Sequence, residues 1–111
     1  MAFEATLEIV NQIAKITLTG ELDATVAAQF RQKIEEAVAQ QAKAIVLMVS
    51  GLDYMSSAGL RVLVFAKQKI GRGVDIFIVG AQEQITEPIN QTGLQNSLNF
   101  LDTYDAAVIE K

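Results

Sequence analysis

Leu52-Asp-Tyr-Met-Ser-Ser-Ala-Gly-Leu-Arg61 lies between two runs of different character. The run before it, 44–49, is short and apolar on both faces, which is typical of a strand covered on both sides. The run after it favours a helix over about 57–70. Two adjacent serines, Ser56 and Ser57, therefore lie in a short loop where a buried strand ends and a helix begins.

A serine at the start of a helix has two roles open to it. The first turn presents unpaired backbone N–H groups and a partial positive charge. A hydroxyl there can cap the helix, and a phosphate there is stabilised by the same groups. The residues alone leave both roles open for Ser57, and the two roles are compatible.

The stretch 44–79 predicts a strand–helix–strand unit, because 74–79 is a second short apolar run. Ser57 then lies beyond the carboxyl end of a central strand, where open α/β sheets usually place their sites. Towards the N-terminus, 3–9 alternates between apolar and polar residues, and 13–18 is rich in β-branched residues. These two runs predict an antiparallel hairpin at the edge of the sheet.

Helical patterns surround this unit. Apolar residues recur at helical spacing from 26 to 38, Asp23 is placed to cap that helix, and its end is expected near 40 or 41. The pattern at 82–90 contains Pro88, which predicts a kinked helix or two pieces. The expected fold is therefore α/β, with a mixed sheet flanked by helices.

The C-terminal residues complete one domain over 1–111. A short edge strand is expected at 98–100, followed by a final helix to about 109. Asp102 and Thr103 are both placed to cap that helix.

The composition excludes several classes of protein. At 111 residues and 50% hydrophobic, the chain suits one domain with a modest core. Its net charge of −4 disfavours a nucleic-acid partner, which needs a basic footprint. No apolar run approaches the ~20 residues of a membrane span, and the first residues do not resemble a signal peptide. We therefore expect a cytoplasmic protein without membrane insertion.

Catalysis is not expected. The chain has no histidine and no cysteine, which removes the commonest general base and metal ligand together with thiolate chemistry. Without a base beside Ser57, an enzyme is not predicted. Glu21, Asp23 and Asp53 are expected near one end of the sheet, but a capping role and solvation explain them as well as a divalent cation does. The prediction is no metal and no cofactor.

The helix predicted over 57–70 carries more apolar residues than covering a sheet requires. One arc of it is assigned to the core: Val62, Leu63, Ala66 and Ile70. Leu60 and Val64 lie away from the centre of that arc, near Ser57 and Arg61. Either the core stripe is wide and loops cover these two residues, or they form a partner-binding surface beside the serines. The sequence leaves both interpretations open.

Three segments resemble the STAS domain family, and within it the stand-alone anti-sigma factor antagonists of bacteria. Leu18-Thr-Gly-Glu-Leu-Asp23 is similar to the family segment at the entry to its first helix. Tyr54-Met-Ser-Ser-Ala-Gly-Leu60 resembles the family's phosphorylation loop, and Thr92-Gly-Leu94 resembles a segment before its last strand. The order and spacing of these segments extend the resemblance across nearly the whole chain.

The resemblance implies a binding module controlled by phosphorylation. Antagonists of this family bind an anti-sigma factor, a serine protein kinase of histidine-kinase-like ATPase fold, and so release a sigma factor. The kinase ends binding by phosphorylating one serine, and a metal-dependent serine phosphatase reverses this. Carried onto this chain, the phosphorylated residue is Ser57, with Ser56 as second choice. The implied partner-binding residues are Glu21, Asp23, Ser56, Ser57, Leu60, Arg61 and Val64.

The chain also departs from the family pattern. Ser56 occupies the position of an aspartate, and Arg61 replaces a residue that is often glycine. A second possibility is therefore a non-switching scaffold subunit of a signalling or lipid-transport assembly, in which the serines only cap the helix. A third is a receiver domain phosphorylated on Asp53, but the acidic pair and the lysine that such a domain needs are not where they should be.

Overall fold

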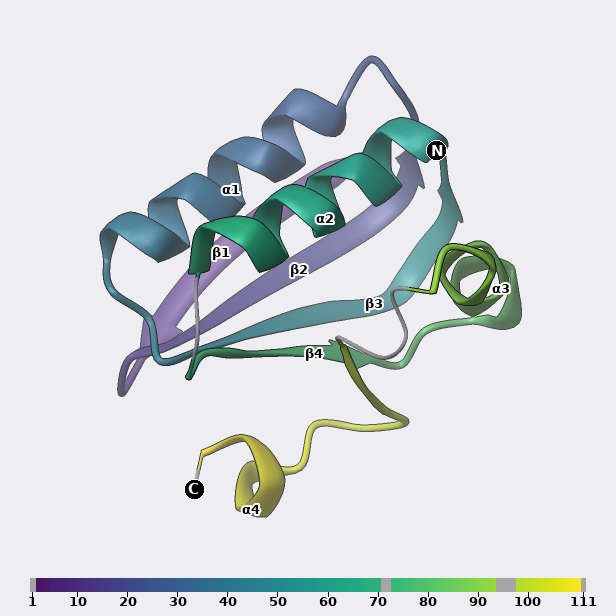
Figure 1. Cartoon of the computed structure of the whole chain (residues 1–111). Coiled ribbons are helices and arrows are strands. Elements are labelled where there is room, and N and C mark those ends of the chain that lie inside the picture. The colour runs from purple at the N-terminus through teal and green to yellow at the C-terminus, as the bar shows by residue number, and fades with distance from the viewer. Residues whose placement is uncertain (1, 71–72, 94–97, 111) are drawn as a thin grey trace.

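The computed structural model describes residues 2–70, 73–93 and 98–110 (Figure 1). Within these residues, strands and helices follow one another as the sequence predicts for a mixed α/β fold. In chain order they are β1 (Glu4–Val10), β2 (Ile13–Leu22), α1 (Ala27–Ala39), β3 (Ala44–Met55), α2 (Ser57–Ile70), β4 (Asp75–Val79), α3 (Glu83–Gln91), β5 (Asn99–Leu101) and α4 (Ala106–Ile109).

The strands form one 5-stranded sheet in the order β1-β2-β3-β4-β5. β1 pairs antiparallel with β2, and each of the other neighbouring pairs is parallel. Both the predicted hairpin and the predicted strand–helix–strand unit are confirmed. The hairpin turns at Asn11 and Gln12, whose φ angles of 54° and 66° are those of a turn that matches the twist of a two-stranded ribbon.

Helices cover the sheet unequally. Figure 1 shows α1 and α2 side by side over one face and the short α4 beyond the other. The larger apolar cluster lies under α1 and α2, where Phe30, Ile34 and Leu63 pack on buried strand residues. A smaller cluster on the opposite face includes Ile109 of α4 and Phe77 of β4. The first half of β3, over 44–49, is covered on both faces because it lies in the middle of the sheet.

The predicted cap of α1 is wrong. The helix begins at Ala27 with Val26 at the capping position, and no side chain caps it. The Asp23 carboxylate instead accepts hydrogen bonds from the backbone N–H of Thr25 at 2.9 Å and from its hydroxyl at 2.6 Å. Such a local turn competes with the helix for the same side chain, so the helix starts later than expected.

β3 continues beyond the predicted end at residue 49, to Met55. Its second half pairs with the end of β2, through register shifts between Thr17 and Thr19 and between Gly20 and Glu21. Gly20 has φ +86°, and a Cβ there would lie 2.4 Å from the backbone oxygen of Ala2. The glycine of the Leu18–Asp23 segment is thus required where the strand is irregular.

The C-terminal third differs from its prediction in two details. α3 is one continuous helix that includes Pro88, so the two-piece alternative is wrong. Ile85 and Ile89 are fully buried and hold both sides of the proline against the core, which offsets the lost backbone bond. α4 is capped by Asp105, which accepts from the N–H of Ala107 at 3.0 Å, and not by Asp102 or Thr103.

Candidate functional site

A single residue, Ser56, joins β3 to α2. Its N–H donates to the carbonyl oxygen of Leu22 at 2.8 Å, which ties the junction to the end of β2. Its Oγ accepts from the N–H of Gly59 at 3.4 Å, the pairing expected of a helix cap. The capping role that the sequence left open for Ser57 therefore belongs to Ser56.

Ser57 is the first residue of α2, and its side chain is exposed. Within the described residues its hydroxyl makes no hydrogen bond. It lies at the positive end of the helix dipole, beyond the carboxyl end of the middle strand. The structure thus presents one serine hydroxyl to solvent, while its neighbour is used to hold the helix.

Gly59 allows the start of α2 to pack closely on the sheet. A Cβ at this position would lie 2.8 Å from Cγ of Met55 and 2.9 Å from Cδ2 of Leu22. Such distances are shorter than carbon atoms tolerate, so a side chain would push the first turn away from β2 and β3. Gly59 therefore allows the first turn of α2, which contains Ser57, to lie close to the sheet.

The apolar residues proposed to flank Ser57 divide between the two interpretations. Val64 is 38% exposed, as a binding surface requires. Leu60 is half-buried and packs against the larger core, as a wide core stripe requires. Arg61 is exposed on the same helix. The side chain of Ile70, the last residue assigned to the core arc, lies outside the described residues.

Two acidic residues of the predicted set lie at the end of β2. Glu21 pairs with Tyr54 across the β2–β3 ladder, and Asp23 follows β2 and is exposed. The hydroxyl of Thr25 donates to Asp23, and this bond lowers the pKa of the carboxyl group. Asp23 is therefore ionised at neutral pH, and its carboxylate is held in one orientation.

Sequence reasoning missed Tyr54, which is 48% exposed beside Glu21. Its exposure follows from the unexpected second half of β3, for which residues 50–53 carry no strand pattern. Among the described residues, no three acidic side chains come together in a way that could hold a metal ion. No helix of the described chain is long and apolar enough to cross a membrane.

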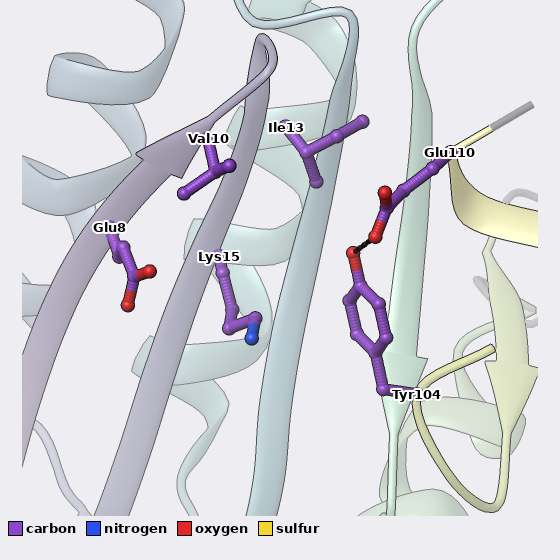
Figure 2. A pocket seen from close by; sticks show the side chains of 6 residues that line it. All are labelled: Glu8, Val10, Ile13, Lys15, Tyr104 and Glu110. Atoms are coloured by element: carbon purple, nitrogen blue, oxygen red, sulfur yellow. Dashed lines mark hydrogen bonds between the residues drawn. The ribbon is translucent and has the colours of Figure 1, made fainter. Parts of the chain in front are cut away.

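A separate hollow of about 220 Å³ lies on the opposite face of the sheet (Figure 2). Lys15 of β2 places its Nζ 4.8 Å from the centre of the Tyr104 ring, a cation–π contact. The Tyr104 hydroxyl donates to Oε2 of Glu110 at 2.5 Å. These contacts join the segment around α4 to β2. The Tyr104 hydroxyl is bonded to Glu110, unlike the exposed hydroxyl of Ser57.

The hydrogen bond to Glu110 raises the pKa of Tyr104 from 10.0 to about 12, with smaller contributions from burial and from the charge of Glu110. The pKa of Tyr104 is higher in the folded protein than in the unfolded chain. The hydrogen bond therefore contributes fully to stability below pH 10, and this contribution is lost as the pH rises through 12. We expect the absorbance titration of phenolate to contain a component near pH 12. Tyr104→Phe should remove it, and Glu110→Gln should move it down.

Circular dichroism at each pH is the control, because the component is informative only while the protein stays folded. A parent protein in which every phenol ionises near pH 10 would contradict the Tyr104–Glu110 bond.

Known proteins resemble this chain in sequence and in fold. The family model described as STAS domain matches residues 4–107. The anti-sigma-F factor antagonist RsfB of Mycobacterium tuberculosis is 30% identical over 98 residues, which are 88% of this chain and 80% of RsfB. Of the segment Thr92-Gly-Leu94 that resembles the family, Leu94 lies outside the described residues.

Solved structures share the fold. An anti-sigma factor antagonist from Mycobacterium paratuberculosis has a TM-score of 0.88 at 24% identity, covering 99% of this chain and 96% of that one. The anti-sigma factor antagonist SpoIIAA in its unphosphorylated form has a TM-score of 0.80 at 24% identity, covering 95% and 93%. Bacillus SpoIIAA in its phosphorylated form has a TM-score of 0.71 at 23% identity, covering 96% of each chain.

Proposed function

The chain belongs to the STAS domain family, and from this we propose that it is an anti-sigma factor antagonist. In its unphosphorylated form it binds an anti-sigma factor and so releases a sigma factor. Its 30% identity to RsfB supports this role, because RsfB is an anti-sigma-F factor antagonist and the match covers 80% of its length. The protein acts as a binding module in the cytoplasm.

Phosphorylation of Ser57 ends the binding. The observation that carries this assignment is the division of roles between the serines: Ser56 caps α2, while the Ser57 hydroxyl is exposed and makes no bond within the described chain. A phosphate adds about −1.5 to −2 charges at pH 7. The helix N-terminus accommodates that charge, but an interface packed around Val64 would have to desolvate it.

The partner is then a serine protein kinase of histidine-kinase-like ATPase fold, and a metal-dependent serine phosphatase restores binding. The partner surface contains Ser57, Arg61 and Val64, all exposed on α2. Glu21, Asp23, Ser56 and Leu60 adjoin it at the end of β2 and in the first turn of α2.

Incubation with ATP and a purified serine protein kinase of the anti-sigma factor class, from the same organism, tests the assignment. Mass spectrometry is expected to find one phosphate per chain, on the peptide that contains Ser57. Ser57→Ala should abolish labelling, whereas Ser56→Ala should weaken the cap but leave the target hydroxyl in place. A stoichiometric phosphate on any other residue would refute the assignment to Ser57.

A further inference from the structure

A groove of about 260 Å³ lies between α1 and α2, close to Ser57. Its apolar lining comes from Ala27, Ala28, Ala58, Val62 and Phe65, and its polar lining from Arg31 and Arg61. Ala58 is the residue directly after Ser57, so the groove reaches the first turn of α2.

The groove is basic although the chain carries a net charge of −4. Arg31 places its guanidinium carbon 4.2 Å from the centre of the Phe65 ring, so its partner is an aromatic face and not a carboxylate. Within the described residues neither Arg31 nor Arg61 forms an ion pair, whereas Lys33 and Glu36 do at 3.5 Å. Two guanidinium groups therefore line one groove, and no carboxylate of the described residues pairs with either.

Ser57 and Arg61 are one helical turn apart on α2. Side chains four residues apart lie on the same face of a helix, with Cβ atoms about 5–6 Å from each other. Helical side chains also lean towards the N-terminus of their helix, which favours an Arg61 side chain directed towards the first turn, where Ser57 lies. A long arginine side chain spans that separation easily.

We propose that this groove receives the phosphate carried by Ser57, with Arg61 as its direct counter-ion and Arg31 as a second positive charge from α1. The inference rests on the proposed phosphorylation of Ser57 and adds how the protein holds the phosphate. Guanidinium and phosphate pair through two parallel hydrogen bonds, stronger than the bonds between neutral groups. When Arg61 pairs with the phosphate, it is no longer free to pair with a carboxylate of the partner. Phosphorylation then adds a negative charge to the binding surface and also neutralises a positive one.

The test uses protein with phosphoserine incorporated at position 57 during synthesis, so that no kinase is needed. Phosphorus-31 NMR follows the second ionisation of the phosphate, whose ordinary pKa is about 6. A nearby guanidinium favours the dianion, so the phosphate pKa in the parent should lie about half a unit below that in Arg61→Gln. Arg31→Gln should also raise the phosphate pKa above that of the parent, by less than Arg61→Gln does.

Lys43→Gln is the matched control, because it also removes one exposed positive charge but lies before β3, at the opposite end of that strand from Ser57. Its phosphate pKa should equal that of the parent. Unphosphorylated Arg61→Gln should keep the thermal midpoint of the parent, which shows that it folds. Equal phosphate pKa values in the parent and in Arg61→Gln would overturn the inference. That result is distinct from failure of the kinase assay, which would leave this titration unaffected.

Discussion

Replacing Ser57 with aspartate is expected to weaken binding to the anti-sigma factor more than about a hundredfold. The substitution places a permanent carboxylate at the exposed start of α2, on the surface that we propose faces the partner. Removing that charge from water at an interface costs on the order of 3 kcal/mol, and each 1.4 kcal/mol is a factor of about ten in affinity. Calorimetric titration of the two purified proteins measures the change.

Ser57→Asn is the matched control, because asparagine has the size of aspartate without its charge. Its affinity should fall much less than that of Ser57→Asp. Equal losses in the two variants would show that bulk and not charge disrupts binding, and would contradict a phosphate switch. Undiminished binding of Ser57→Asp would favour the scaffold alternative, in which the junction has only a structural role.

Leu22→Ala is expected to lower the free energy of unfolding by about 2–5 kcal/mol, the usual cost of deleting a fully buried leucine side chain. Leu22 is completely buried, and its Cδ2 atom is one of the atoms nearest to Gly59. The cavity would therefore open under the first turn of α2. Urea denaturation followed by circular dichroism measures the change.

Val10→Ala provides the comparison, because Val10 is also apolar and in a strand but is 54% exposed. Its cost should stay below about 1 kcal/mol. A similar decrease in the free energy of unfolding for both variants would mean that Leu22 does not stabilise the core as its burial indicates.

Local patterns were sufficient for much of the fold. The apolar run at 44–49, the alternation at 3–9 and the helical spacing at 26–38 each depend on which face of an element is buried, and each element is present. A helix start beside the two serines was predictable for the same reason, although the loop expected before it is strand as far as Met55.

The details that failed depend either on a contact between distant segments or on local differences too fine for a sequence pattern. The second half of β3 exists because it pairs with the irregular end of β2, and the run at 50–53 has no strand pattern of its own. Asp23 is a good capping residue in isolation, but it bonds Thr25 instead. The division of roles between Ser56 and Ser57 follows from a one-residue difference in where α2 begins, which is finer than sequence patterns resolve.

The groove between α1 and α2 was also beyond sequence reasoning. Arg31 and Arg61 were both visible as charged positions, but nothing local indicates that their helices lie side by side. Phe65 had no assigned role, and its ring proves to be the surface on which Arg31 rests.

The hydrogen bond from Ser56 to the Leu22 carbonyl makes one surface out of two distant parts of the chain. An enzyme that approaches Ser57 meets the end of β2, the end of β3 and the first turn of α2 together. A short peptide with the sequence around Ser57 would lack the end of β2. If Ser57 is phosphorylated as we propose, we expect the reaction to require the folded protein, because the surface around this serine depends on the β2–β3 pairing.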